Sequence, residues 1–444
     1  MDKLLQYPHN RIKLFIFKFV RLNRLKTNNM KIIYTTILLA ATLTSCSNAN
    51  STSEKIQVVD NQEISDTLTP VETKKGNADY KPAFEGQTRI AGVKTTTPYE
   101  FKVITESLNA PWGVVELPDG RLLITETEGV MRIVDASSGK VSEEITGIPE
   151  VDDRGQGGLL GLTLSPDFSN DRMIFWAFTE KVDKGNHTAI AKGKLSKDEK
   201  TIENAQVIYR ASPTYDGKLH YGGRVIFDKE GNLFVSIGER SDKETRVKSQ
   251  DLNTSFGKIV HITTEGKPVA GNPFEGQADA RPEIYSYGHR NPQGLAFHPE
   301  TGELWCNEFG PRGGDELNLI KPGKNYGWPI ITYGIEYAGG EIGDPVIQQK
   351  DGMEQPVYYW DPVLSPSGMT FYKGDKIPEW KNNLFIGGLN SNHIARLVIE
   401  GNKVVGEERI LADEGERFRD ITQGRNGELY VVTQGGKLYS IDGK

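Results

Sequence analysis

A histidine stands immediately before a strand-like segment in KLHYGGRVIFDKEGNLFVSIGER, residues 218–240. His220 is followed by Gly222 and Gly223, which let the backbone come close to a neighbouring group. An imidazole in such a place is able to act as a general base near neutral pH. A single histidine is, however, more often a hydrogen-bonded loop residue. The rest of the sequence has to decide between these two interpretations.

Four other segments place rare polar residues among glycines. They are RGQGGLLGLTLSPDF (154–168) with Gln156, SYGHRNPQGLAFHP (286–299) with His289, Arg290 and Asn291, NEFGPRGGDELNLIKPGKNYGWP (307–329) with Asp315 and Glu316, and GERFRDI (415–421) with Arg417 and Arg419. The last two arginines would share one face of an extended strand, and such a pair suits a carboxylated or phosphorylated ligand. Backbone carbonyls near the two acids suit a hard cation such as Ca²⁺, although acids after a glycine pair are usually a solvated turn.

The N-terminus predicts export. Residues 30–46, MKIIYTTILLAATLTSC, combine a lysine, a short apolar run and small residues before a cysteine. This pattern predicts a bacterial lipoprotein signal that is cleaved before Cys46, with lipid added to that thiol and residues 1–45 removed. The protein would then be attached to a membrane by the lipid only, on the periplasmic or outer-surface side. A plain signal peptide with a chance cysteine is the alternative, and either Met1 or Met30 could be the start.

The charge of the mature chain argues against a nucleic-acid partner. The whole chain has a net charge of −7, and without its first 45 residues it has 45 basic and 59 acidic residues. Such an acidic protein is poorly suited to a phosphate backbone. The two cysteines are Cys46 and Cys306, so lipidation of the first leaves no intrachain disulfide.

The rest of the chain divides into a polar segment and a β-rich region. Residues 46–85 are rich in Ser, Thr, Asn and Asp, which predicts a flexible tether. Residues 86–444 repeat a turn followed by a short apolar strand. The copies are DGRLLITE (119–126), NDRMIFWAF (170–178), EGNLFVSIG (230–238), TGELWCNE (301–308), KNNLFIGG (381–388) and NGELYVVT (426–433). Six copies without amphipathic helices between them predict an all-β, six-bladed β-propeller, with a large sandwich or another blade number as alternatives.

Taken in order, these motifs resemble a known enzyme family. NAPWGVVELPDG, GQGGLLGLTLSPDF, the His220 segment, YGHRNPQGLAF, GPRGGDELNLI with NYGWP, and RFRDI are similar to motifs of the soluble quinoprotein sugar dehydrogenases, over about residues 108 to 440. The resemblance implies a six-bladed propeller that uses pyrroloquinoline quinone (PQQ) and Ca²⁺. It also implies oxidation of an aldose sugar at C1 to the lactone, with electrons passed to an external acceptor such as a quinone or a cytochrome.

The same resemblance assigns roles to individual residues. It implies that His220 is the general base and that Glu239 lies close to the substrate or behind the histidine. It implies cofactor contacts at Gln156, Arg290, Asn291, Thr332, Tyr333, Gly334, Ile335, Gly388, Leu389, Asn390, Arg417 and Arg419. It implies that the carbonyls of Gly310 and Pro311 hold the catalytic calcium, and that Glu316 and Tyr326 are ligands of a further, structural calcium.

Two departures favour the aldose dehydrogenase branch of that family. Asn390 stands where the glucose dehydrogenases have a lysine, so one cofactor cation is missing. Glu239 stands where they have an aspartate and is one methylene longer. These differences leave the sugar preference open.

Two other functions remain as alternatives. A calcium-dependent lactonase-type propeller hydrolase would need side-chain carboxylates that converge on the metal, whereas this chain offers a Gly-Pro pair and several arginines. A non-catalytic, lipid-anchored binding propeller would be favoured if His220 or the arginine pair were absent, and both are present.

Overall fold

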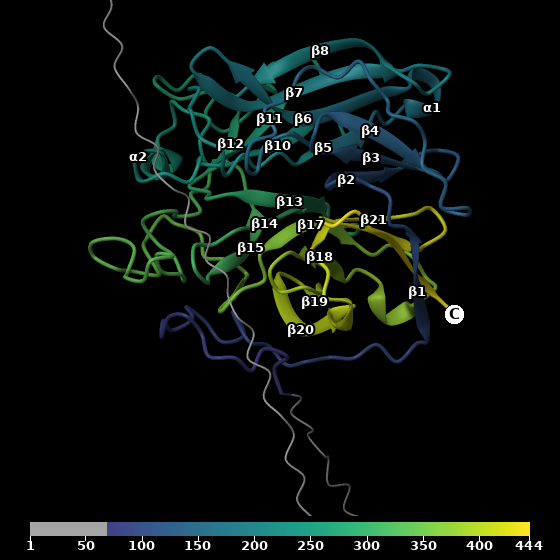
Figure 1. Ribbon diagram of the computed structural model, residues 1–444. Coiled ribbons are helices and arrows are strands. Elements are labelled where there is room, and N and C mark those ends of the chain that lie inside the picture. Colours follow the sequence, from purple (N-terminus) through teal and green to yellow (C-terminus); the bar gives the residue numbers. More distant parts are fainter. Residues whose placement is uncertain (1–68) are drawn as a thin grey trace, which may run out of the picture. The chain divides into compact units, whose positions relative to one another are not determined.

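Each of the six turn-and-strand repeats becomes the second strand of its own sheet. The computed structural model describes residues 69–444, which contain six antiparallel sheets (Figure 1). From the innermost strand outward, the first blade is β2 (Pro111–Glu116), β3 (Leu122–Glu126) and β4 (Val130–Val134), and the second is β5 (Leu159–Leu164), β6 (Met173–Val182), β7 (Gly185–Leu195) and β8 (Ile202–Arg210). The third blade is β9 (Val225–Phe227), β10 (Leu233–Ile237), β11 (Lys258–Ile262) and β12 (Ile284–Tyr287), and the fourth is β13 (Pro292–Phe297), β14 (Leu304–Glu308), β15 (Asp315–Ile320) and β16 (Tyr358–Trp360). The fifth blade is β17 (Pro366–Phe371), β18 (Leu384–Gly388), β19 (Ile394–Glu400) and β20 (Lys403–Ile410), and the sixth is β21 (Phe418–Gln423), β22 (Leu429–Thr433), β23 (Leu438–Gly443) and β1 (Tyr99–Thr105).

Helices are short in the described part of the chain. They are α1 (Phe168–Asp171), α2 (Lys243–Arg246) and the 3₁₀ turns η1 (Val247–Gln250), η2 (Pro378–Trp380) and η3 (Ala412–Glu414). Within residues 69–444, none is long and apolar enough to cross a membrane.

A residue with positive φ ends the turn before each second strand. Glycine takes this place in four blades, as at Gly231 (φ 83°) and Gly427 (φ 95°), while Arg172 and Asn382 take it in the other two. Glycine adopts this conformation without steric cost, which explains why a glycine often precedes the apolar strand in the sequence repeats. The strands that follow, such as β10 and β22, are buried at every position because both of their faces pack against neighbouring blades.

The ring closes through strands from opposite ends of the domain. Strand β1 pairs antiparallel with β23, with Tyr99 opposite Gly443, so the last blade takes its outer strand from the N-terminal side. The innermost strands contact one another around the ring in the order β2, β5, β9, β13, β17 and β21, and back to β2. The predicted all-β, six-bladed propeller is therefore confirmed.

The flexible tether predicted for residues 46–85 does not extend to residue 85. Residues 69–85 contact the blades: Glu72 forms an ion pair with Arg409 at 2.7 Å, and the Asn77 N–H donates to Asp361 at 2.8 Å. Polar composition alone could not reveal these contacts, because they are made by hydrogen bonds rather than by apolar burial. The predicted lipoprotein signal, Cys46 and the rest of the tether lie outside the described residues.

Candidate active site

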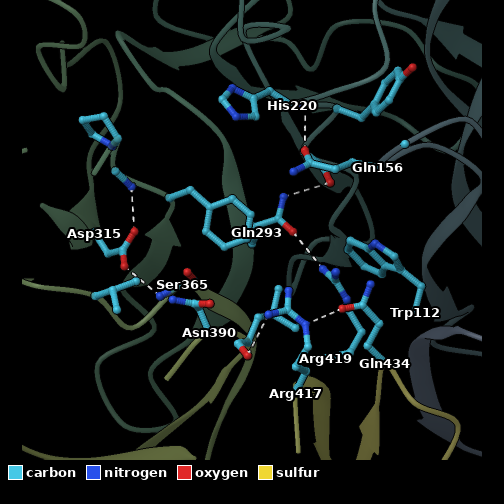
Figure 2. A pocket seen from close by; sticks show the side chains of 18 of the residues that line it. Trp112, Gln156, His220, Gln293, Asp315, Ser365, Asn390, Arg417, Arg419 and Gln434 are labelled. Atoms are coloured by element: carbon cyan, nitrogen blue, oxygen red, sulfur yellow. Dashed lines mark hydrogen bonds between the residues drawn. The ribbon is translucent and has the colours of Figure 1, made fainter. Parts of the chain in front are cut away.

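A cavity of about 710 Å³ lies at the end of the ring where the innermost strands begin. Each blade contributes residues at or just before the start of its innermost strand. These residues include Trp112, Gln156, His220, Gln293, Ser365 and Arg419. Figure 2 shows the side chains converging from different blades. The propeller thus brings together residues, such as Trp112 and Arg419, that are more than 300 positions apart in the sequence.

His220 is held in a fixed orientation by two neighbours. Its backbone has a positive φ of 50°, and its side chain is buried. The backbone N–H donates to Oε1 of Gln156 at 2.9 Å, while Nδ1 lies 2.8 Å from Oε1 of Glu239. Gly238 is required here, because a Cβ at that position would lie 2.2 Å from the His220 carbonyl oxygen. A left-handed backbone at a non-glycine residue is strained and is common at functional sites.

The environment keeps the imidazole neutral. Burial lowers the pKa of His220, the charge of Arg290 lowers it further, and the hydrogen bond with Glu239 acts in the opposite direction. A carboxylate only accepts hydrogen bonds, so Nδ1 carries the proton toward Glu239. The lone pair of Nε2 is then free to accept a proton in the cavity that His220 lines. Glu239 is itself held by the Ser241 N–H at 2.7 Å.

Two arginines in the cavity have only neutral partners. Arg417 donates to Gln434 at 2.7 Å and to the Leu389 carbonyl, and Arg419 donates at 3.3 Å to both Gln293 and a serine hydroxyl. Burial lowers the pKa of Arg419 to about 10, and the charges of Arg417 and Arg224 add to this effect. Within residues 69–444 neither Arg417 nor Arg419 pairs with a carboxylate, so the cavity offers two cations to an anionic ligand.

Arg290 and Asn291 lie directly behind the cavity wall. Nη1 of Arg290 donates to the Gly310 carbonyl at 2.5 Å, and Oδ1 of Asn291 accepts the Gly222 N–H at 3.0 Å. Nε of Arg290 and Nδ2 of Asn291 are buried without a hydrogen-bond partner in the described part of the chain. Buried donors of this kind are costly unless something satisfies them. Both residues therefore support the cavity from behind, and each has a buried donor without a partner among the described residues.

The loop of residues 310–314 is anchored by Asp315. Its carboxylate accepts the N–H groups of Gly310, Leu364 and Ser365 at 2.7–2.9 Å, and burial raises its pKa to about 6. Gly310 and Pro311 line the cavity, and their role as carbonyl ligands of a cation stays a prediction. Among residues 69–444 no group of three or more His, Cys, Asp or Glu side chains is arranged around a metal position. A calcium ion at this loop would thus depend on backbone carbonyls and on ligands from a bound cofactor.

Comparisons with known proteins agree with this geometry. The family model described as Glucose / Sorbosone dehydrogenase matches residues 108–440. The chain belongs to the glucose/sorbosone dehydrogenase family. Aldose sugar dehydrogenase YliI of Escherichia coli is 42% identical over 344 residues, which cover 77% of this chain and 92% of that protein. Quinoprotein glucose dehydrogenase B of Acinetobacter calcoaceticus is 27% identical over 425 residues, 78% of this chain and 87% of that protein.

Solved structures give the same assignment. The apo-form of the soluble aldose sugar dehydrogenase from Escherichia coli is 40% identical with a TM-score of 0.74, and covers 78% of this chain and 100% of its own. A PQQ-bound aldose sugar dehydrogenase from Streptomyces coelicolor is 30% identical with a TM-score of 0.64, and covers 79% and 100%. Membership of this dehydrogenase family makes the protein an oxidoreductase, which confirms the class predicted from its motifs.

The remaining cofactor residues predicted from the family divide into two groups. Leu389 and Asn390 line the cavity, and Gly388 immediately precedes them at the end of β18. Thr332, Tyr333, Gly334 and Ile335 lie behind the 310–314 loop instead. Ile335 bridges to Arg312, and the Tyr333 ring stacks on Tyr359 with centroids 4.0 Å apart. The second group therefore supports the loop rather than lining the cavity.

The two residues predicted for a structural calcium lie away from the cavity. Glu316 stands opposite Glu308 in the β14–β15 pair, and burial together with this second carboxylate raises the pKa of Glu316 well above its usual value. Nδ2 of Asn318 donates to both carboxylates, at 3.0 and 3.1 Å. The Tyr326 hydroxyl donates to the Leu319 carbonyl at 2.7 Å, so it is engaged within the protein. The proposed calcium role of these two residues stays a prediction.

Some cavity residues were not singled out by the sequence patterns. Trp112 lies within the motif NAPWGVV, and its ring is 4.6 Å from the Arg224 guanidinium and 5.7 Å from that of Arg419. Gln293 and Gln434 orient the arginine pair, and Asn77 comes from the predicted tether. Trp112 and Gln293 lie in the quoted motifs and could have been identified from them, whereas Asn77 lies in no motif.

Proposed function

We propose that the protein oxidises an aldose sugar at C1 to the lactone, with PQQ and Ca²⁺ as cofactors. The observation that carries this proposal is one cavity that contains a neutral, oriented His220 and the cation pair Arg417 and Arg419. PQQ carries three carboxylates, so its negative charge matches the unneutralised arginines. The PQQ-bound structure of the Streptomyces coelicolor relative supports this choice of cofactor.

The residues of this cavity fit the proposed cofactors. Arg417 and Arg419 would hold carboxylates, Gln156 and Asn390 offer amides at the cavity surface, and the carbonyls of Gly310 and Pro311 are hard oxygen donors for calcium. The bound quinone supplies a hydride acceptor that calcium polarises. The protein chain supplies the orientation and the electrostatic environment.

His220 performs the proton transfer in this proposal. The C1 hydroxyl of an aldose is a very weak acid, so a base must take its proton as the hydride departs. Nε2 of His220 is the available base because Nδ1 is committed to Glu239 at 2.8 Å. Glu239 also stabilises the imidazolium that forms, while the Gln156 side chain fixes the backbone beneath the ring. A positioned base of this kind contributes about 10²- to 10⁴-fold in rate.

The lactonase-type alternative has less support from the site. A calcium-dependent hydrolase would need several carboxylates that converge on its metal, and within the described chain the cavity presents arginines and backbone carbonyls there. A purely binding role would not require a strained, neutral histidine that is hydrogen-bonded to a buried carboxylate. Both features favour an oxidoreductase with an anionic cofactor.

The decisive experiment is reconstitution. Purified apoprotein is mixed with PQQ and Ca²⁺, and reduction of an electron-accepting dye is followed with a panel of aldoses. We expect a quinone absorbance on the protein and oxidation of at least one aldose, with lactone as the product. Protein that takes up no PQQ and oxidises no aldose would contradict the proposal.

We further propose that LTSC directs lipidation of Cys46, so that the enzyme is an exported lipoprotein held at a membrane by its lipid alone. Electrons would then pass to an external acceptor, such as a quinone or a cytochrome, at that membrane surface.

A further inference from the structure

Residues 69–97 form a strap that lies against the propeller before its first strand. The strap precedes the part of the chain that matches the family, which begins at residue 108. Its Pro70 and Ala91 form a β-bridge with each other, and Gly92 forms one with Glu407 of β20. Arg89 donates to the carbonyls of Glu72, Lys74 and Asp361 at 2.7–2.9 Å. These contacts hold the strap in place on the propeller, so that a residue of the strap can have a defined position and role.

One residue of this strap, Asn77, reaches the catalytic cavity. The Asp361 carboxylate accepts the backbone N–H groups of Asn77 and Ala78 at 2.8 and 3.2 Å. A Cβ on Gly76 would lie 2.4 Å from the same carboxylate, so glycine permits this close approach. These contacts hold the backbone at Asn77 independently of its side chain.

The Asn77 side chain orients an arginine at the mouth of the cavity. Its Nδ2 donates to Asp361 at 3.1 Å and to the Pro362 carbonyl at 2.9 Å, and its Oδ1 accepts Nε of Arg312 at 3.1 Å. Both N–H groups of the amide are therefore engaged, and its oxygen accepts from Arg312. The Asn77 amide can therefore act on a ligand by positioning Arg312.

Among the described residues Arg312 has no carboxylate partner, and most of its donors are free. A guanidinium has five N–H groups, and Asn77 occupies the one on Nε. Among the described residues neither terminal nitrogen has a hydrogen-bond partner, and no carboxylate pairs with the side chain. Arg312 is exposed, whereas Gly310, Pro311 and the two glycines that follow it are buried, so its side chain lies at the rim.

We propose that Arg312, positioned by Asn77 of the strap, determines sugar specificity by donating to hydroxyls remote from C1. This assignment rests on the proposed sugar oxidation. His220 and Arg312 line the same cavity, the first buried and the second exposed, so a sugar whose C1 meets His220 would bring its remote hydroxyls toward Arg312. Asn77 is a positioning residue, because it acts through the arginine.

The test compares glucose with 4-deoxyglucose and 6-deoxyglucose on enzyme loaded with PQQ and Ca²⁺. In Arg312→Met, KM for glucose should rise about 10-fold, the lower end expected for a hydrogen bond from a charged group. In Asn77→Ala it should rise about 3-fold, as for the loss of one neutral hydrogen bond. In both variants kcat stays close to wild type. The ratio of kcat/KM for glucose to kcat/KM for at least one of the deoxy sugars falls toward one. The double variant should match Arg312→Met.

The matched control is Glu72→Gln, which removes the ion pair between the strap and Arg409 without touching the cavity. Glu72→Gln should keep the wild-type KM and sugar preference even if its melting temperature falls. PQQ uptake, measured by absorbance, should be equal in all variants. Calorimetry with methyl glucoside, which measures sugar binding without turnover, should show a loss of affinity in Arg312→Met and Asn77→Ala that matches their rise in KM.

The outcomes separate this assignment from the proposed function. A wild-type holoenzyme that neither oxidises nor binds any aldose overturns both. An active wild type whose KM and deoxy-sugar preference survive Asn77→Ala and Arg312→Met overturns the specificity role alone.

Discussion

Replacing Arg419 with glutamine should stabilise the apoprotein and weaken cofactor binding. This arginine lines the cavity, is partly buried, and lies beside two other cations, Arg417 and Arg224. Its own hydrogen bonds go to neutral acceptors on Gln293 and Ser367. The charge is therefore unfavourable in the apoprotein and becomes favourable only when an anion binds.

The size of the effect follows from the pKa. The pKa of Arg419 falls from 12.5 to about 10, and each pH unit corresponds to about 1.4 kcal/mol. Keeping the charge thus costs about 3 kcal/mol, and the two hydrogen bonds lost in the variant offset about 1 kcal/mol of the gain. We expect Arg419→Gln to raise the free energy of unfolding of the apoprotein by about 2 kcal/mol. PQQ affinity should fall about 10- to 100-fold, the usual effect of losing a charged hydrogen bond.

Differential scanning calorimetry without ligand and titration calorimetry with PQQ and Ca²⁺ measure the two quantities. Arg425→Gln is the matched control, since Arg425 pairs with Glu116 outside the cavity at 3.2 Å. That control should lower stability or leave it unchanged, and should bind PQQ like wild type. If Arg419→Gln melts at or below the wild-type temperature and binds PQQ with unchanged affinity, the reasoning from the unpaired cations is refuted.

Four further predictions concern the base, its pH dependence, its partner and the anchor. His220→Ala should keep PQQ binding and lower kcat about 10²- to 10⁴-fold, as measured on fully loaded enzyme. Because burial lowers the pKa of His220, the wild-type kcat should hold at pH 6.5 and fall only in more acidic buffer, where the imidazole becomes protonated. Glu239→Gln should lower kcat and move that acid limb to still lower pH, since the Glu239 carboxylate raises the pKa of His220; an unmoved limb would count against the pairing. Cys46→Ser should release the protein from the membrane fraction, and mass spectrometry that finds an unmodified N-terminus other than residue 46 would contradict lipidation.

The blade architecture could be predicted because the repeats encode it locally. The turn before β10 needs a residue with positive φ, which Gly231 supplies, and the strand that follows is buried on both faces. Both requirements leave a visible pattern of glycine followed by large apolar residues. The pairing of β1 with β23 leaves no such pattern, because it joins residues at opposite ends of the domain.

The site residues that could be predicted from the sequence are those that stand in glycine-rich motifs. His220, Gln156 and Arg419 stand in such motifs, and the structure brings all three to one cavity. Asn77 lies in a polar segment whose composition is typical of a tether, and its contact with Arg312 depends on backbone hydrogen bonds to Asp361. Side-chain amides in an irregular segment have no periodicity, so only the fold can reveal them.

The charge distribution explains how an acidic protein could attract an anionic cofactor. The whole chain carries a net charge of −7, so its long-range field would repel a tricarboxylate. The attraction must then be local, and Arg417 and Arg419 contribute to it with charges that no carboxylate in the described chain neutralises. The partial burial of Arg419 strengthens its interaction with an anion, because less water screens it than at the surface. The same burial that makes Arg419 unfavourable in the apoprotein therefore makes it selective for a ligand that brings its own negative charge.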